Sequence, residues 1–292
     1  MQIVTDSGTD TGLTAAEAKK LNVHINPLIV SLGGESFKEG IDLDVQAFYR
    51  LLAEAEDELP TTSQPSIGSF VELYRELART DPDILSIHIS SGLSGTYNAA
   101  LSAVEQVPEA NVTVVDTKTL SAAAGWQVHY AAQAAAAGWS KDRILETLRT
   151  LSRACESLYT LKELRYLIHG GRISHMKGLL ASVLNIKPII GVDTESGIYV
   201  QRGQARSFKN ALKGLVNQME SISGGAEKLR VQVLHASNPE GAQELAAMIS
   251  SRFETDWLPG GQISLVLGAH TGPSMVGAAF APQAVFTDFG LE

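Results

Sequence analysis

Cysteine is almost absent from this sequence. Cys155 is the only one in 292 residues, so no disulfide can form within the chain and a metal site built on several cysteines is excluded. The seven histidines follow no H-E-x-x-H or similar ligand spacing. We therefore expect neither a disulfide framework nor a bound metal.

Basic residues are scarce relative to acidic ones. The chain has 23 lysines and arginines against 32 aspartates and glutamates, which gives a formal charge of −9. No long basic run is present, and nucleic acids are bound by basic surfaces. Nucleic acid is therefore not an expected partner, and docking on an anionic membrane surface is disfavoured for the same reason.

Long hydrophobic runs are also missing. No stretch reaches the roughly 18 apolar residues of a membrane helix. The alanine-rich segment 121–139 comes nearest, but Gln127, His129 and Gln133 interrupt it, so we interpret it as a buried helix. The N-terminus has no basic segment followed by an apolar core. We expect no integral membrane segment and a cytoplasmic location.

Short apolar segments alternate with helical ones in the first half of the chain. Residues 2–6, 83–89 and 111–116 are typical of buried parallel strands, and the apolar spacing over 67–79 is helical. This alternation predicts an α/β fold in which helices flank a parallel sheet. Because the pattern changes near Cys155, we predict two α/β domains, residues 1–155 and 156–292.

The second half is expected to contain both paired strands and helices. Residues 186–202 predict two strands around a turn, and residues 162–174 predict a helix closed by glycines. The apolar segments RVQVLHA (230–236) and ISLVLGA (263–269) predict two later strands. His270 would then lie in a loop after the second of these strands.

The segment SSGLSGTYN, residues 90–98, joins an expected strand to an expected helix. A helix N-terminus offers free N–H groups and a partial positive charge, and the hydroxyls of Ser94 and Thr96 can donate further hydrogen bonds. The glycines would let another group approach the backbone closely. The pattern is typical of an anion site, and equally of an ordinary N-cap and tight turn without a ligand.

The same segment only partly matches known catalytic motifs. Ser94 lies in GLSGT, which departs from the nucleophile elbow G-x-S-x-G at Thr96, and no G-x-x-x-x-G-K-[ST] phosphate loop is present. We therefore expect no catalytic residue and no cofactor. An acyl hydrolase that uses Ser94, Asp116 and His270 stays an alternative.

Three other loops carry polar residues that could reach a ligand. TTSQPS, residues 61–66, ends at Ser66, which is predicted to cap the next helix. Arg172 follows two glycines in HGGRIS, where it could reach a carboxylate or a helix end. His270 lies in HTGP, and a lone histidine in a loop is more often a surface residue than part of a site.

Taken together, these segments are far more specific than any one of them. The series TDS (5–7), TTSQPS, SSGLSGTYN, GGRIS, IKPII and HTGP resembles the DegV family of bacterial proteins over nearly the whole chain. The resemblance implies two α/β domains with a long-chain fatty acid, such as palmitate, in an apolar tunnel at the domain junction. In some members of that family, a separate ATP-dependent kinase phosphorylates the bound carboxylate, so the resemblance implies a non-catalytic carrier subunit.

The resemblance also assigns the carboxylate site residue by residue. It implies contacts to the carboxylate from Thr62, Ser94, Gly95, Thr96, Arg172 and His270. Arg206 in RGQAR matches a further family arginine, although Gln204 replaces the lysine found there. We hypothesise that Arg172 or Arg206 serves in docking of the kinase or in transfer. A small-anion-binding protein remains the other alternative class.

Overall fold

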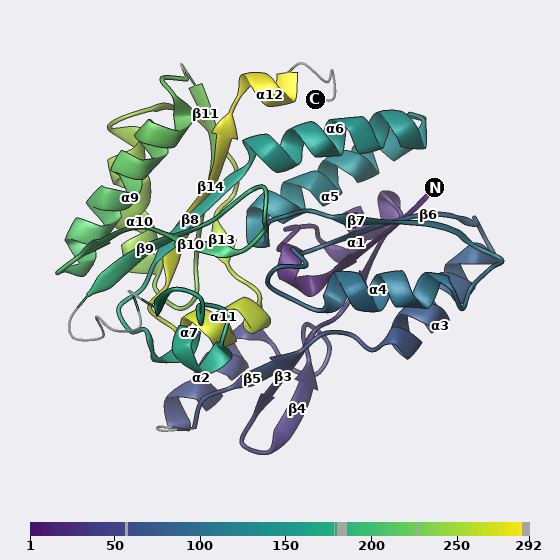
Figure 1. Ribbon diagram of the computed structural model, residues 1–292, viewed down its shortest axis with the longest axis horizontal. Helices are drawn as coiled ribbons and strands as arrows, with labels where there is room; N and C mark the ends of the chain where they lie inside the picture. Colours follow the sequence, from purple (N-terminus) through teal and green to yellow (C-terminus); the bar gives the residue numbers. More distant parts are fainter. Residues whose placement is uncertain (56–57, 178, 180–185, 227, 288–292) are drawn as a thin grey trace.

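A parallel sheet forms the core of the early part of the chain (Figure 1). The structure is a computed structural model that describes residues 1–55, 58–177, 179, 186–226 and 228–287. The strand order is β2, β1, β6 and β7, and every neighbouring pair is parallel. The strands are β1 (Gln2–Asp6), β2 (Val23–Asn26), β6 (Asp83–His88) and β7 (Asn111–Asp116).

Helices cover both faces of this sheet. Val4 and Ile84 pack with the helices α3 and α4, whereas Ile3 and Leu85 point to the opposite face, where α5 lies. The two-residue period of a strand places neighbouring side chains on opposite faces, so the predicted parallel sheet flanked by helices is confirmed. The helices here are α1 (Ala15–Lys20), α3 (Ile67–Ala78), α4 (Thr96–Val104), α5 (Ser121–Ala136) and α6 (Lys141–Ala154).

Side-chain caps begin several of these elements. Ser66 accepts a hydrogen bond from the N–H of Ser69 at 3.0 Å and so caps α3, as predicted. Ser140 caps α6 in the same way. Asp6 accepts from the N–H of Gly8 at 3.0 Å and caps the short 3-10 helix η1 (Ser7–Thr9).

A larger, seven-stranded sheet forms the late part of the chain, in the order β10, β9, β8, β14, β11 and β12, with β13 also paired to β11. Its pairs are antiparallel except those of β11 with β12 and β13. The strands are β8 (Glu156–Thr160), β9 (Lys187–Val192), β10 (Tyr199–Ala205), β11 (Lys228–His235), β12 (Glu254–Trp257), β13 (Gly261–Gln262) and β14 (Val276–Pro282). The helices α9 (Phe208–Ser223) and α10 (Pro239–Ser250) pack on one face. The predicted strand pair at 186–202 is therefore confirmed as β9 and β10.

A small third sheet lies beside the junction of these two parts (Figure 1). It pairs β4, β3 and β5 in antiparallel order, and the helix α11 of the late part packs against β3 and β5. The elements are β3 (Ile29–Leu32), β4 (Glu35–Lys38), β5 (Thr61–Ser63), α2 (Val45–Glu54), α7 (Arg165–Gly170), α11 (Leu265–Thr271) and α12 (Ala284–Thr287). α7 is the predicted helix closed by glycines, and its C-cap residue Gly171 is left-handed, with a φ of 75°.

The prediction of a strand at 263–269 is wrong. Leu265–Thr271 form the helix α11, and His270 lies in its last turn instead of in a loop. Nearly all side chains of this short helix are buried, and an apolar run that is buried on every side has no period that separates a strand from a helix. Its N-terminus is held from outside: the carboxylate of Asp10 accepts from the N–H of Ser264 at 2.8 Å, and that of Glu39 accepts from the N–H of Leu265.

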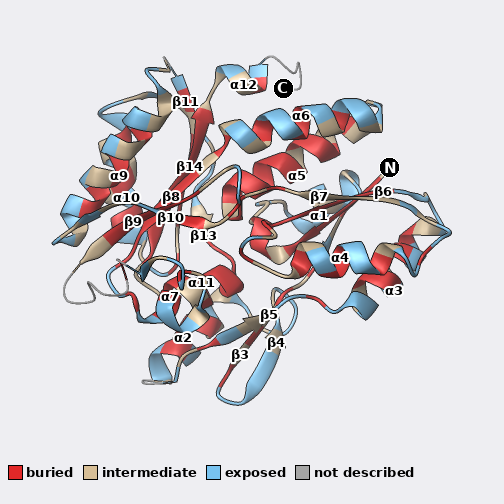
Figure 2. Ribbon diagram, viewed as in Figure 1, coloured by how far each residue is buried: buried red, intermediate tan, exposed pale blue. Residues whose placement is uncertain are grey.

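The alanine-rich segment forms α5, which is buried along most of its length between the two large sheets (Figure 2). α5 contacts β1 and β6 of the parallel sheet as well as β8 and β14 of the larger one. The domain division at residue 155 therefore stays a prediction: the strands of the parallel sheet end at Asp116 and those of the larger sheet begin at Glu156, but α5 packs on both. Within the described ranges, no helix is both long and apolar enough to cross a bilayer.

Candidate functional site

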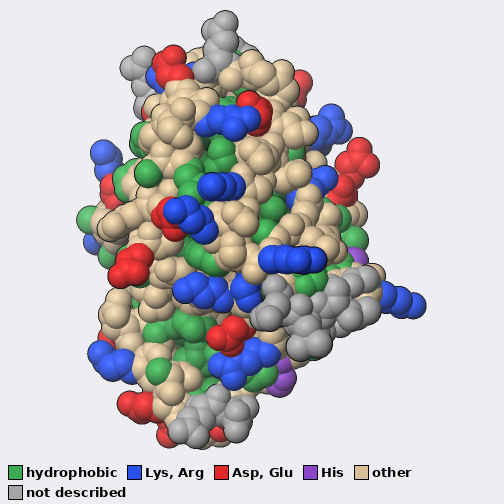
Figure 3. Space-filling view, turned by 90° about the vertical axis from the view of Figure 1, so that its left-hand side faces the viewer, with side chains coloured by type: hydrophobic (Ala, Val, Ile, Leu, Met, Phe, Trp, Pro, Cys, Tyr) green, Lys and Arg blue, Asp and Glu red, His purple; other side chains and the backbone are tan. Residues whose placement is uncertain are grey.

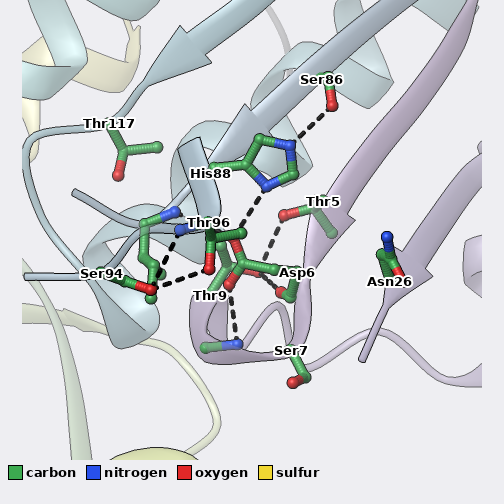
Figure 4. A network of polar contacts seen from close by, with 12 residues as sticks. Thr5, Asp6, Ser7, Thr9, Asn26, Ser86, His88, Ser94, Thr96 and Thr117 are labelled. Carbon is green, nitrogen blue, oxygen red and sulfur yellow. Dashed lines mark hydrogen bonds and ion pairs between the residues drawn. The ribbon is translucent and has the colours of Figure 1, made fainter. Parts of the chain in front are cut away.

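The hydroxyl-rich turn lies between β6 and α4, as the sequence predicts. The Oγ of Ser94 lies 2.9 Å from Oγ1 of Thr96 and accepts from the Thr96 N–H at 3.3 Å (Figure 4). The N-cap residue itself is Gly95, which has no side chain to cap with. The Ser94 hydroxyl therefore occupies the start of α4, where the helix has its free N–H groups.

The glycines of this turn allow other chain segments to come close. A Cβ on Gly92 would lie 2.8 Å from the carbonyl oxygen of Gly197, in the turn between β9 and β10. A Cβ on Gly95 would lie 2.9 Å from Nε2 of Gln64, in the loop after β5. The two glycines are thus explained by close packing against the late sheet and the small sheet.

A second polar pair joins the small sheet to α11. Oγ1 of Thr62 lies 2.7 Å from Nε2 of His270, although the two residues are 208 positions apart in sequence. The pKa of His270 is lowered to about 4, mainly by burial and in smaller part by the nearby Arg172 guanidinium. His270 is therefore a neutral imidazole near pH 7, placed in surroundings whose charge is positive.

Arg172 lies between His270 and the hydroxyl turn. Its Nη1 donates to the carbonyl oxygen of Gly170 at 2.5 Å, and its Nε donates to the carbonyl oxygen of Leu93 at 3.3 Å. Gly170 in turn lies against His270, because a Cβ there would be only 2.1 Å from Nδ1 of the imidazole. The half-buried guanidinium therefore connects the end of α7 to the residue directly before Ser94.

The structure brings most of the predicted site residues together. Contacts run from Thr62 to His270, on to Gly170 and Arg172, and from there to Leu93 beside Ser94. The residues assembled in this way, which we call the junction cluster, are Thr62, Ser94, Gly95, Thr96, Arg172 and His270. Arg206 lies outside the cluster: it is exposed between β10 and α9. The roles of all seven residues stay predictions.

The hydrolase alternative requires a hydrogen bond between Ser94 and His270. In the described ranges, Ser94 is bonded to Thr96, and His270 is bonded to Thr62. Asp116 is used elsewhere, since it accepts from the Ser91 hydroxyl at 2.5 Å and pairs with Lys118 at 3.0 Å. The arrangement does not form a base-activated nucleophile.

The sequence analysis did not predict a second histidine network. Nδ1 of His88 lies 2.9 Å from the Asp6 carboxylate, and its Nε2 lies 2.7 Å from the Ser86 hydroxyl (Figure 4). The Ser86 hydroxyl also bonds that of Tyr74. The order of groups is that of a Ser-His-Asp triad, but the residues are completely buried. The available signal was the S-x-H spacing of residues 86 and 88, which places both side chains on one face of β6.

A small apolar cavity lies beside α11. Its volume is about 30 Å³, and the side chains around it are mainly apolar, including Leu267 of α11, Leu158 of β8 and Met275, the residue before β14. Thr271, which follows His270 in α11, also borders it. A space of this size holds only one or two water molecules, so it can take a long ligand only if the surrounding side chains move apart.

A family model described as "Uncharacterised protein, DegV family" matches residues 1–283. The chain belongs to the DegV family. It is 34% identical over 275 residues to a DegV domain-containing protein of Staphylococcus aureus (strain MRSA252), covering 94% of this chain and 96% of that one. A DegV domain-containing protein of Deinococcus radiodurans is also 34% identical, over 276 residues that cover 94% of this chain and 95% of that one.

Solved DegV structures share this architecture. A fatty-acid-binding DegV family protein from Thermus thermophilus superposes with a TM-score of 0.86 at 29% identity, covering 96% of this chain and 99% of that one. DegV from Bacillus subtilis, a fatty acid binding protein, superposes with a TM-score of 0.85 at 28% identity, covering 97% and 99%. These relatives confirm the predicted α/β fold and the predicted family.

Proposed function

We propose that this protein binds a long-chain fatty acid, with the carboxylate at the junction cluster and the acyl chain along the apolar cavity. The observation that carries the proposal is the position of His270. It pairs with Thr62 at 2.7 Å, it lies beside the cationic Arg172, and the residue after it borders the apolar cavity. The fatty acid binding of the Thermus thermophilus and Bacillus subtilis relatives supports it.

The chemistry of the two regions suits the two ends of such a ligand. The hydroxyls of Ser94 and Thr62 can each donate to a carboxylate, and a hydrogen bond to a charged group contributes about 1.5–3 kcal/mol. Burial contributes about 0.8 kcal/mol per CH₂, so the acyl chain supplies most of the affinity and the polar cluster sets its orientation. A small anion would use only the polar end.

The test is the ligand itself. The protein is purified from cells, extracted with organic solvent and examined by mass spectrometry, and the delipidated protein is then titrated with palmitate and with acetate. We expect an intact long-chain fatty acid in the extract and tight binding of palmitate but not of acetate. Equal affinity for the two acids would favour the small-anion alternative, and release of acyl ester products on incubation would favour the hydrolase.

We also propose that the protein is a non-catalytic carrier that presents the carboxylate to a separate ATP-dependent kinase. In that reaction a carboxylate oxygen bonds to the γ-phosphorus of ATP and ADP leaves, which gives an acyl phosphate. Arg172 is a cation of the junction cluster, and positive charge there would stabilise the developing negative charge. Ser94 is hydrogen-bonded to Thr96 and not to His270, and this arrangement favours a carrier over an enzyme that uses Ser94 as a nucleophile.

Basic side chains near Arg206 support docking of a partner there. Lys187 pairs in register with Ala205, the residue before Arg206, and its Nζ donates to the carbonyl oxygen of Lys162 at 2.8 Å. Lys and Arg side chains on this side of the molecule, where α9 lies, are interspersed with Asp and Glu side chains (Figure 3). Because the whole chain carries −9, the basic side chains around Arg206 would orient an acidic partner.

The docking hypothesis is tested by separating binding from transfer. Arg172→Ala and Arg206→Ala are compared with the exposed Arg50→Ala as control, first in palmitate titration and then in kinase-dependent acyl phosphate formation. We expect near-normal palmitate affinity and reduced transfer for at least one of the two variants. Normal transfer in both, or a loss that only follows palmitate affinity, contradicts the docking role.

A further inference from the structure

β7 is an edge strand whose outer side has no partner strand in the described part of the chain. It pairs only with β6, through residues 111–116. An edge strand presents unpaired N–H and C=O groups to which another extended chain can bond. The four residues between Asn111 and Asp116 are uncharged and β-branched, and all are half-buried. Residues of this kind fit a sheet well, so β7 is suited to accept a strand on its free side.

The other sheet edges carry features that hinder such pairing. β10 has an irregular register between Gln201 and Gly203, and β12 and β4 carry charged side chains, among them Glu254 and Glu35. β2 has only four residues and β5 only three. Bulges, charges and short length protect an edge from added strands. Among the described edge strands, β7 combines six residues, a regular register and an uncharged central stretch.

A groove of about 780 Å³ follows this edge. Four consecutive residues of β7, Thr113–Asp116, border it. Because neighbouring side chains of a strand point to opposite faces of the sheet, the groove lies along the edge of β7 and not over one face. The other sides are formed by α6 and by Thr194 and Glu195 in the turn after β9. The free backbone groups of β7 are therefore next to an open space.

The groove also reaches a buried polar atom without a partner. Gln127 of α5 borders the groove and is completely buried, and its Oε1 has no hydrogen-bond partner in the described ranges. Buried acceptors are nearly always paired with a donor. An N–H group that enters the groove would supply the donor that this side chain lacks.

One side of α6 brings positive charge to the groove. Arg149 and Arg153 both border it, and residues four apart lie on the same side of a helix. Both are exposed, and neither forms an ion pair or a side-chain hydrogen bond within the described residues. Of the two acidic residues at the groove, Asp116 is paired with Lys118 at 3.0 Å, and Glu195 is exposed in the turn after β9. The wall formed by α6 therefore favours acidic side chains.

We propose that this groove binds an extended acidic segment of a partner protein, which adds to the parallel sheet as a further strand beside β7. Alternate residues of a strand are about 6.6 Å apart, and residues four apart on a helix are about 6 Å apart along its axis. Two acidic side chains on one face of the segment would therefore reach Arg149 and Arg153 while its backbone bonds β7.

A second copy of this chain fits the groove less well. Antiparallel pairing of two β7 edges would place the two α6 helices, with the same pair of arginines, on one face of the joined sheet, and like charges would repel. The groove and the junction cluster share no residue, so the inference does not depend on fatty acid binding.

The experiment uses the whole protein and a synthetic six-residue peptide in which glutamate alternates with threonine. One control peptide has lysine in place of glutamate, and a second has glutamate but is methylated at every backbone nitrogen, which keeps the charge and removes the N–H donors. Binding is measured by NMR titration, together with hydrogen exchange of the β7 amides. The protein variant is Arg149→Ala with Arg153→Ala, and the matched control is Arg50→Ala with Arg79→Ala, two exposed arginines outside the groove.

We expect the glutamate peptide to bind and to slow exchange of the outward amides of β7. The groove variant should weaken binding by about five- to tenfold, the control variant should not, and both control peptides should bind far more weakly. Arg153→Gln alone, with a smaller loss, provides the same test if the double variant does not fold. The proposal is overturned if the glutamate peptide does not bind, if either control peptide binds equally well, or if the β7 amides are unaffected. A concentration-dependent dimer that protects these amides without peptide would make the occupant a second copy and would also overturn it.

Discussion

The protein contains two histidines that each lie beside hydroxyl groups, and the two networks differ in one respect. His88 is bonded to a carboxylate of the chain itself, Asp6, and to Ser86 in a completely buried position. His270 is bonded to Thr62, and the charged group that acts on it, the Arg172 guanidinium, is positive. A histidine that is already bonded to a buried carboxylate of the chain contributes to stability. A histidine beside a positive charge favours the binding of an anionic ligand.

The contrast also corrects an intuition about catalytic triads. The order Asp6, His88 and Ser86 matches the triad chemically, yet its serine hydroxyl is already bonded to Tyr74 at 2.7 Å and no solvent reaches it. The junction cluster has more accessible hydroxyls, but its members are bonded in other pairs. Access to a ligand, and not the identity of the residues, separates the two networks.

The largest expected effect is on stability, at the buried network. His88→Ala would leave the carboxylate of Asp6 buried without its imidazole partner, so we expect the free energy of unfolding to fall by about 3–5 kcal/mol. Urea denaturation measures this change. Thr62→Ala, which removes the partner of the other histidine, is the control and should change stability by less than half as much. Equal losses would end the distinction between the two networks.

Gly170→Ala should separate structure from binding at the junction cluster. The added Cβ would lie 2.1 Å from Nδ1 of His270, so the imidazole must move from Thr62, and we expect palmitate affinity to fall at least tenfold, about 1.4 kcal/mol. Gly171→Ala is the control: its φ of 75° makes the change cost about 1–2 kcal/mol of stability, but its Cβ meets no described atom within 4 Å. A larger loss of affinity in Gly171→Ala would contradict the assigned position of His270.

Ser94→Ala tests the hydroxyl at the start of α4. Removing one hydrogen bond to a charged carboxylate should weaken palmitate binding by about 1.5–3 kcal/mol, measured by direct titration of the delipidated protein. Ser140→Ala, which removes the side-chain cap of α6, should lower stability by about 1 kcal/mol and leave affinity unchanged. Unchanged affinity in a folded Ser94→Ala variant would remove Ser94 from the site.

The smallest effect is a titration shift. In the free protein the pKa of His270 is lowered to about 4. A bound carboxylate favours the charged imidazolium, so the pKa should rise on binding, and affinity should increase as pH falls toward the pKa of the complex. NMR titration of the histidine Cε1 protons checks this, with His235, whose pKa is lowered by burial away from the cluster, as the internal reference. A His270 signal that does not respond to palmitate would leave it without a role in binding.

Local sequence patterns predicted most of the fold because the relevant forces act between near neighbours. Local patterns correctly predicted the strands at 2–6, 83–88 and 111–116. They also predicted the helix cap at Ser66 and the helix that ends before Gly171. The failure at 263–269 has a specific cause. α11 is short and buried on all sides, and its first N–H groups are bonded by Asp10 and Glu39, which lie more than 220 residues earlier in the chain.

The sequence by itself determined the absence of a disulfide, the parallel sheet with its flanking helices, and a set of polar segments whose order is that of the DegV family. Tertiary structure decided which of those segments meet. Thr62 reaches His270 across 208 residues, and Arg172 joins α7 to the turn before Ser94. Helix and strand patterns arise from contacts a few residues apart, whereas a binding site depends on the three-dimensional packing of distant segments, which no local pattern records.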